Sequence, residues 1–235
     1  MPSNTINREI EKVKAIVPVE RRALLVVNCL AEHGDARFRW LYEYIELAGV
    51  GVARRFLKRH YRAIYALQDK EATRLEFLSL LQSLTADYHN EAVDLFFQVH
   101  GKPGRVRFFD QWVSTHMLGE YIRRTAVPNR LRLVYNLSCY GDSHSPGFLN
   151  AGFRVSVGAR KINANAGTEY PVFCRAWHGK TFGRPGGSVV NYIMRRADRT
   201  LPRRIQDRIA SRYFNDVDSE KLIRGDGNIS IYSMP

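Results

Sequence analysis

Two reactive side chains in this sequence each follow a short hydrophobic run directly. His100 comes after residues 93–99 and precedes Gly101, and Cys139 comes after residues 131–137 and Ser138. A cysteine attacks a carbonyl carbon as the thiolate, so it needs a base or a lowered pKa, and a nearby imidazole supplies either. Each residue alone is usually inert at a strand end. As a pair, they indicate nucleophilic chemistry on an acyl group.

The two hydrophobic runs predict buried strands that can bring this pair together. If the strands are neighbours joined by a right-handed crossover helix at residues 112–125, His100 and Cys139 emerge at one edge of a sheet. Gly101 lacks side-chain bulk, so its backbone N–H can approach a substrate. Together with the N–H of Cys139, it would form an oxyanion hole.

The rest of the chain alternates predicted strands with helical segments. This alternation predicts an α/β fold with a mostly parallel central sheet of about six strands and helices on both faces. Further strands are expected at residues 23–27, 61–67, 152–157 and 228–232, and a small hairpin arm at 105–108. We expect a helical lead-in over residues 1–19 and one domain over residues 20–235, because 235 residues with 45% hydrophobic content can bury a substantial core.

Composition constrains the partners. The chain has 36 Lys and Arg against 23 Asp and Glu, a net charge of +13, which makes an acidic partner such as nucleic acid possible. A solvated helix face is the favoured interpretation of each basic group, however, because both groups fall on predicted helices. The densest groups are Arg54, Arg55, Lys58, Arg59 and Arg62, then Arg195, Arg196, Arg199, Arg203, Arg204 and Arg208.

Three cysteines do not make a disulfide framework in a chain of this length, which favours a reducing, cytoplasmic location. The N-terminus lacks the apolar core of a signal peptide, and no window is long and apolar enough for a membrane span. Cys and His residues lack zinc-site spacing, and no Gly-rich loop has P-loop or Rossmann spacing. We therefore expect no metal and no cofactor.

The order of these features resembles one known family. A hydrophobic strand, His-Gly, a spacer helix, a second hydrophobic strand, a small residue and Cys follow one another as in the caspase-like cysteine peptidases, which include caspases, metacaspases, legumains, gingipains, clostripain and separase. The resemblance covers the topology from about residue 20 to 200, while residue-level matching is confined to His100-Gly101 and Ser138-Cys139-Tyr140-Gly141. It implies a caspase-like sandwich.

The resemblance also implies roles for individual residues. Cys139 would attack the scissile carbonyl of a protein or peptide substrate, and His100 would protonate the leaving amine. The backbone N–H groups of Gly101 and Cys139 would hold the oxyanion, and an activating protein partner is possible. The strand after the nucleophile would line the substrate cleft, a role that falls to Val155, Ser156, Val157 and Gly158.

One departure from the family bears on specificity. Metacaspases and legumains carry a carboxylate two positions before the nucleophile, where this chain has Leu137. Asp142 could replace that carboxylate in attracting a basic side chain, or it could stabilise the turn after the nucleophile. Arg154 and Arg160 could instead hold an acidic side chain. The sequence does not choose between these alternatives.

Other side chains compete less well for a catalytic role. His144 could act as the base if its loop folds back, and His33 could pair with Cys29. His116 falls on the predicted spacer helix, where exposure to solvent is expected. Cys29 and Cys174 are expected to be core thiols.

Two other functions remain open at this point. The chain could be a catalytically silent caspase-like module that binds a protein partner or an anionic polymer through its basic helices. It could also carry out a different thiol chemistry on the same sheet, such as acyl transfer.

Overall fold

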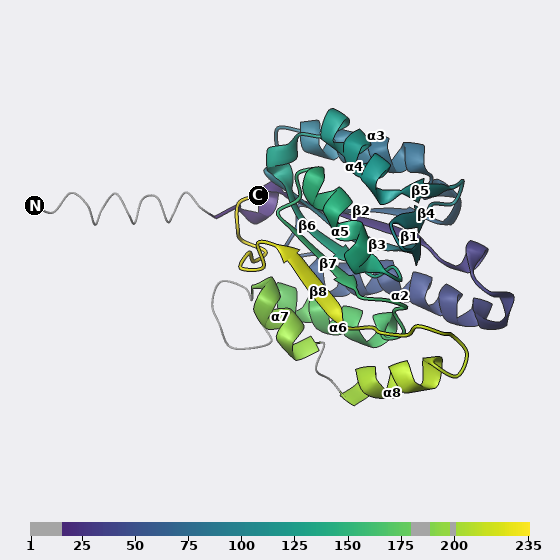
Figure 1. The fold of residues 1–235 in the computed structure, drawn as a ribbon. Helices are drawn as coiled ribbons and strands as arrows, with labels where there is room; N and C mark the ends of the chain where they lie inside the picture. Colours follow the sequence, from purple (N-terminus) through teal and green to yellow (C-terminus); the bar gives the residue numbers. More distant parts are fainter. Residues whose placement is uncertain (1–15, 180–188, 198–200) are drawn as a thin grey trace, which may run out of the picture.

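A mixed β-sheet runs through the middle of the molecule (Figure 1), with strand order β2-β1-β3-β6-β7-β8. The structure is a computed structural model that describes residues 16–179, 189–197 and 201–235. Neighbouring strands from β2 to β7 are parallel, and β8 is antiparallel to β7. The strands are β1 (Arg22–Cys29), β2 (Ala63–Gln68), β3 (Ala92–Lys102), β6 (Leu131–Asn136), β7 (Val155–Ala159) and β8 (Lys221–Gly225).

The central strands are hydrophobic on both faces because both faces are covered. In β1, Leu25 and Val27 face one hydrophobic cluster, while Leu24 and Val26 face a second cluster on the opposite side. Continuous apolar runs are typical of strands in such doubly covered sheets. This is why the strands around residues 23–27 and 93–99 could be predicted from the sequence.

Helices pack on both faces, as the sequence predicts. On one face lie α3 (Arg74–Ala86), α4 (Thr115–Thr125) and α5 (Gly141–Asn150). On the other lie α2 (Arg39–Leu57), α6 (Ala166–Trp177) and α7 (Val190–Ala197). In Figure 1, α8 (Leu201–Ala210) lies below α6, at the bottom of the view.

A small antiparallel arm extends the sheet beyond His100. β4 (Arg105–Arg107) pairs with the end of β3, and β5 (Trp112–Ser114) pairs with β4. The arm at residues 105–108 is therefore confirmed, but the spacer helix predicted to begin at residue 112 begins at Thr115. Val113 is buried between half-buried neighbours, an alternation that suits a strand.

The prediction for the C-terminal strand is wrong. Residues 228–232 form turns that bury Ile229 and Ile231, and the outer edge of β7 is instead occupied by β8. Most of the predicted lead-in at residues 1–19 lies outside the described residues, and at its end Ile16 forms a single β-bridge with Ser233. Short 3-10 turns occupy Val19–Arg21, Ala31–His33, Ala36–Phe38, Asp69–Glu71 and Pro128–Arg130.

Charged side chains are buried near the amino ends of β3 and β6. The Arg132 guanidinium donates to both oxygens of the Asp94 carboxylate, at 2.9 and 2.5 Å, and both side chains are fully buried. Arg132 also donates to the carbonyls of Ile231 and Ser233, so it ties the C-terminal segment to the sheet. Over the described ranges, no helix is both long and apolar enough to cross a membrane.

Candidate active site

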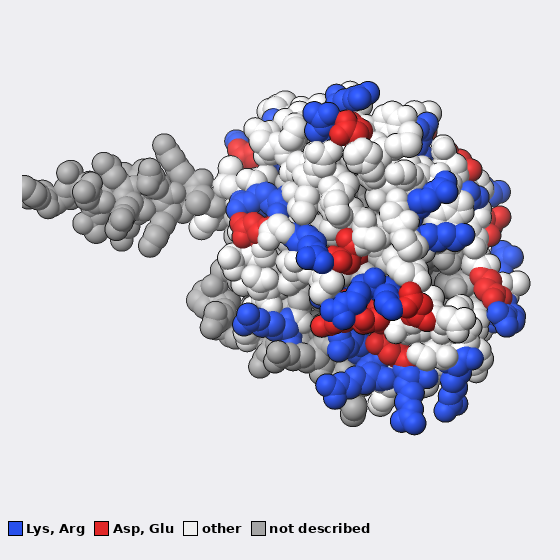
Figure 2. Space-filling model, viewed as in Figure 1, with Lys and Arg blue, Asp and Glu red and all other residues white. Residues whose placement is uncertain are grey.

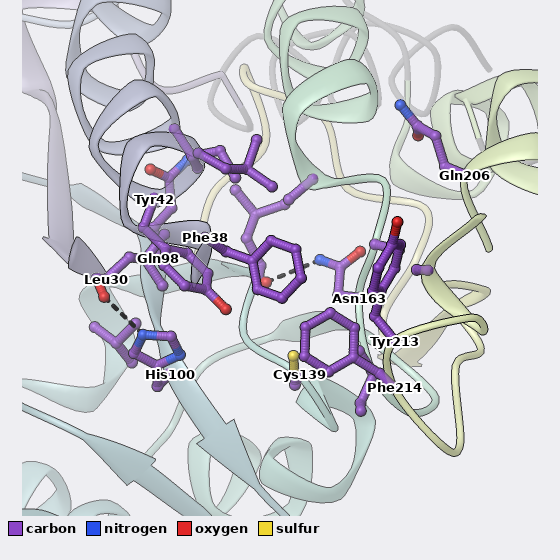
Figure 3. Close-up of a pocket in the computed structure, with 18 of the residues that line it drawn as sticks. Leu30, Phe38, Tyr42, Gln98, His100, Cys139, Asn163, Gln206, Tyr213 and Phe214 are labelled. Carbon is purple, nitrogen blue, oxygen red and sulfur yellow. Dashed lines mark hydrogen bonds between the residues drawn. The ribbon is translucent and has the colours of Figure 1, made fainter. Parts of the chain in front are cut away.

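His100 and Cys139 emerge at the same edge of the sheet because their strands are neighbours. β3 and β6 run parallel, with Phe97 opposite Asn136, and the Leu137 N–H donates to the Phe97 carbonyl at 2.8 Å. Both reactive side chains line one pocket of about 510 Å³ (Figure 3). The predicted adjacency of the two strands is confirmed.

The tautomer of His100 follows from its hydrogen bond. Its Nε2 lies 2.7 Å from the Leu30 carbonyl oxygen, which can only accept, so Nε2 carries the proton and Nδ1 keeps a free lone pair. Figure 3 shows the second ring nitrogen on the side of the ring that faces Cys139. The Tyr42 ring packs edge-on against the imidazole, with ring centroids 5.1 Å apart. His100 is thus oriented from two sides.

The Leu30 carbonyl that orients His100 is itself fixed. The buried Glu46 carboxylate accepts hydrogen bonds from the N–H groups of Leu30 and Ala31. Asn28 donates to the Glu46 carbonyl at 2.7 Å and so ties β1 to α2. A chain of contacts therefore runs from α2 through the end of β1 to the imidazole.

Both reactive groups are held in their neutral forms. Burial lowers the pKa of His100, and the nearby His33 lowers it further, against the opposing hydrogen bond to Leu30. Burial also raises the pKa of the Cys139 thiol, and this outweighs the backbone N–H of Asn163 and the charge of Lys221, which lower it. At neutral pH the site holds a thiol and a neutral imidazole rather than an ion pair.

Cys139 sits on a strained turn between β6 and α5. Tyr140, the next residue, has left-handed backbone angles of φ 57° and ψ 28°, which are unfavourable for a residue with a side chain. The Tyr140 N–H donates to the Lys161 carbonyl at 2.7 Å, and its hydroxyl donates to Asp216 at 3.1 Å. These contacts hold the turn that presents the thiol to the pocket.

A buried polar network supports the wall of the site beside Cys139. The Asn163 side chain donates to the Leu137 carbonyl at 2.8 Å and accepts from the Lys221 ammonium at 3.0 Å. Lys221 also forms a fully buried ion pair with Glu169 at 2.8 Å. This network could not be predicted from the sequence, because its members are far apart in the chain and share no motif.

Gly101 is required for close packing between the two motifs. A Cβ atom at this position would lie 2.1 Å from the Cys139 carbonyl oxygen and 2.9 Å from Cε1 of His144. No real side chain fits there, so the glycine lets the end of β3 meet the nucleophile turn. The absence of a side chain at Gly101 thus serves packing against this turn.

The competing histidines and thiols have other roles. His144 is buried, with Nδ1 accepting from Asn136 at 3.0 Å and Nε2 donating to the Lys102 carbonyl at 2.8 Å, so both ring nitrogens are engaged. Nε2 of His33 lies 2.7 Å from the backbone carbonyl oxygen of Phe109 and is hydrogen-bonded to it. As predicted, His116 is exposed, and Cys29 and Cys174 are buried.

The strand after the nucleophile does not line the pocket that holds His100 and Cys139. Val155, Ser156, Val157 and Gly158 are all buried in β7, which is paired on both edges. The side chains of Val155 and Val157 lie in the core, and Ser156 accepts a hydrogen bond from Ser145. Because β8 covers the outer edge of β7, the pocket wall beyond Cys139 is formed by Ile162, Asn163, Ala164 and Ala166 instead.

The charged residues considered for specificity are also engaged elsewhere. Asp142 forms a two-bond ion pair with Arg224 of β8, at 2.7 and 2.9 Å, and does not line the pocket. Arg154 pairs with Asp226. Arg160 pairs with Asp218 and Glu220. The sequence-based proposal of Asp142 as a substrate-binding residue is therefore not supported by its position.

Side chains around the start of α2 also line the pocket. Phe38, Leu41, Tyr42 and Ile45 are half-buried because they line the pocket rather than the core. The opposite wall comes from α8 and the residues after it, where Tyr213 and Phe214 pack against Phe38. In the described part of the chain, no cluster of three or more His, Cys, Asp or Glu side chains could hold a metal ion.

The basic residues do not form one continuous patch on the face shown in Figure 2. Lys and Arg side chains there are interspersed with Asp and Glu over most of the surface, and basic side chains project along the lower edge, where α8 lies. Arg62, one of the basic residues after α2, pairs with Asp87 at 2.5 Å. Arg199, in the second basic group, lies outside the described residues.

No protein-family model matches the sequence, and no curated protein matches it. Solved structures do resemble it. The initiator caspase Dronc from Drosophila superposes with a TM-score of 0.56 at 13% identity, over 94% of this chain and 84% of that one. A secreted C11 cysteine protease from Bacteroides thetaiotaomicron, solved with an irreversible peptide inhibitor, gives a TM-score of 0.47 at 12% identity, over 68% and 55% of the two chains. The chain therefore has a caspase-like fold.

Proposed function

We propose that this chain, built on a caspase-like fold, is a cysteine endopeptidase that hydrolyses peptide bonds with Cys139 as nucleophile and His100 as general acid and base. The observation that carries the proposal is that both side chains line one pocket at the carboxyl ends of adjacent parallel strands. The hydrogen bond from His100 to Leu30 leaves Nδ1 as the lone pair available for proton transfer.

In the first step, Nδ1 of His100 accepts the thiol proton as the Cys139 sulfur attacks the scissile carbonyl carbon. The C=O π electrons move to oxygen, and the oxyanion is held by the backbone N–H groups of Gly101 and Cys139. The tetrahedral intermediate collapses as the C–N bond breaks, and the imidazolium returns its proton to the leaving amine. The products of this step are a thioester on Cys139 and the released amine.

In the second step, water hydrolyses the thioester. Nδ1 removes a proton from the water as its oxygen attacks the carbonyl, and it then protonates the sulfur as the C–S bond breaks. The acid product leaves, and the neutral thiol and imidazole return. This cycle fits the neutral resting forms of both groups, because the imidazole removes the thiol proton only during attack.

The proposal extends to the setting of the enzyme. The substrate is a peptide or protein, and an activating protein partner is compatible with it. Cys29, Cys139 and Cys174 are all free thiols, which fits a reducing compartment such as the cytoplasm. We expect residues 20–235 to act as one domain and the reaction to need no cofactor.

A direct test compares the original chain with Cys139→Ala on a peptide library, with product analysis by mass spectrometry. We expect Cys139-dependent cleavage, with the water-derived carboxylate as product even when an amine is added. Cys174→Ala is the matched control, since Cys174 is buried in α6, does not line the pocket, and has a pKa raised by burial. Equal cleavage by the original chain and Cys139→Ala would refute the proposal, and a product that carries the added amine would indicate acyl transfer.

A further inference from the structure

We infer that the site selects substrates whose residue on the acyl side of the cleaved bond carries a large aromatic or aliphatic side chain. This inference rests on the proposed function and narrows it to a substrate class. It answers the question that the sequence left open, because neither an acidic nor a basic side chain finds a partner in the pocket.

The pocket is placed to receive that side chain. Cys139 and His100 are both among the residues that line it, so a substrate whose carbonyl carbon lies at the Cys139 sulfur has its adjacent side chain within reach of the cavity. The volume, about 510 Å³, falls within the range of roughly 300–1,000 Å³ that is typical of ligand pockets. The cavity can therefore hold a bulky side chain.

The walls of the pocket are apolar. Among the described residues that line it, none is Asp, Glu, Lys or Arg. Leu137 occupies the position two residues before the nucleophile and forms part of this wall. Phe38 also lines the pocket and packs directly against Tyr213 and Phe214. The main aromatic and aliphatic side chains are those of Phe38, Leu41, Ile45, Leu137, Tyr213 and Phe214.

A charged substrate side chain would lose its hydration here without gaining an ion pair. Burying an unpaired charge is strongly unfavourable, whereas burying an aromatic or aliphatic side chain is favourable. Asp142 is already paired with Arg224 and Lys221 with Glu169, and the Glu46 carboxylate is engaged by the N–H groups of Leu30 and Ala31. The pocket therefore discriminates against both signs of charge.

Two polar side chains in the walls are engaged with the protein, whereas the buried side-chain oxygen of Gln98 has no hydrogen-bond partner among the described residues. Asn163 donates to the Leu137 carbonyl, and the Gln206 carbonyl oxygen accepts from the Thr168 hydroxyl at 3.0 Å. These contacts hold the wall together. Most of the lining is nevertheless aromatic or aliphatic, so a large apolar substrate side chain gains the most from burial here.

The test uses four fluorogenic peptides that differ only in the residue before the cleaved bond: Phe, Leu, Arg and Asp. We expect kcat/KM for the Phe and Leu peptides to exceed that for the Arg and Asp peptides by at least about a hundredfold. Cleavage that depends on Cys139 but favours Arg or Asp would overturn this inference and leave the peptidase proposal standing. If none of the four peptides is cleaved in a Cys139-dependent way, both this inference and the peptidase proposal are overturned.

Variants at the pocket sharpen the test. Leu137→Asp places a carboxylate in the wall and should shift preference toward Arg, but Leu137 is buried and this protein can misfold. Ile209→Asp places one at the pocket rim, where Ile209 is 52% exposed, and should raise the Arg-to-Phe ratio about five- to tenfold.

Ile205→Asp is the matched control. Ile205 lies one turn earlier on α8, is 49% exposed and does not line the pocket, so its ratio should not change. Thermal melting verifies that each variant is folded. Equal ratios for Ile209→Asp and Ile205→Asp would contradict the assignment of this pocket.

Discussion

The two ends of the neighbouring strands β3 and β6 differ in how they treat reactive and charged groups. Near their amino ends, Asp94 and Arg132 are fully buried and neutralise each other through two hydrogen bonds. At their carboxyl ends, His100 and Cys139 line a pocket. The shifts in their pKa values favour the neutral forms, so the two groups do not form an ion pair with each other. The same two strands thus carry a structural ion pair at one end and the candidate site at the other.

The difference lies in what completes each end. Arg132 is satisfied by Asp94 and by the carbonyls of the C-terminal segment, so the pair contributes a defined packing arrangement. β6 is followed closely by Tyr140, whose backbone angles are left-handed. Gly101, near the end of β3, packs against the turn that carries Cys139, and an apolar pocket lies beside both strand ends. Functional groups in parallel sheets gather at the carboxyl ends of strands, and this chain follows that rule.

The largest effect is expected on catalysis, from a substitution at the carboxyl ends of these strands. His100→Ala should lower kcat/KM for peptide cleavage by about 10²- to 10⁴-fold, because it removes the proton-transfer group. The melting temperature should change little, since His100 makes one side-chain hydrogen bond at the pocket edge. His116→Ala, at an exposed position on α4, is the control. Full activity of His100→Ala, measured in the same assay, would exclude the proposed dyad.

The next largest effect is expected on protein stability, from substitutions near the amino ends of β3 and β6. Asp94→Ala leaves the Arg132 charge buried without its partner and should lower the free energy of unfolding by about 3–5 kcal/mol, measured by urea denaturation. Replacing both residues, as Asp94→Leu with Arg132→Met, should recover much of that loss because no unpaired charge remains. The folded fraction of each variant should keep its kcat/KM. A loss under about 1 kcal/mol for Asp94→Ala would show that the ion pair is not the structural element described here.

The pH dependence of kcat/KM tests the protonation states of His100 and Cys139. The pKa of His100 is lowered, so the neutral imidazole that accepts the thiol proton persists below the usual value of 6.5, and the acid limb should have its midpoint under 6.5. The pKa of Cys139 is raised, so the alkaline limb should lie above 9.0. An acid limb with its midpoint above 6.5 would contradict a neutral resting pair.

The smallest effect is expected for Asp142→Asn. It removes an ion pair with the half-exposed Arg224, which should cost no more than about 1 kcal/mol of unfolding free energy. Its preference among the Phe, Leu, Arg and Asp peptides should be unchanged because Asp142 does not line the pocket. A loss of Arg-peptide cleavage on this substitution would restore the role that the sequence allowed for Asp142.

Much of the fold could be predicted because burial on both faces leaves a continuous apolar run. The runs at residues 23–27 and 93–99 correspond to β1 and β3 for this reason. β8 could not be recognised, since Lys221 and Arg224 interrupt an edge strand whose partner is distant in sequence. The alternating isoleucines at 229 and 231 gave a strand signal, but they are buried within turns.

The candidate site was only partly visible in the sequence. His100, Gly101 and Cys139 form short motifs, and the crossover between two parallel strands was enough to bring them together. The group that orients His100 is the backbone carbonyl of Leu30. Every residue has a backbone carbonyl, so the amino-acid sequence does not reveal which one binds the imidazole. The apolar pocket depends on the residues after α8 packing against Phe38, just before α2, a contact between segments far apart in the chain.

The most direct test of the account is covalent labelling of the thiol with a peptidyl acyloxymethyl ketone that carries Phe beside the ketone. Intact-mass and peptide-mapping spectra should show one adduct, on Cys139, with Cys29 and Cys174 unmodified. His100→Ala should slow labelling at least about tenfold, and His116→Ala should leave it unchanged. Labelling of Cys29 or Cys174 in place of Cys139, or labelling of Cys139 at the same rate without His100, would contradict the central claim that these two residues act together.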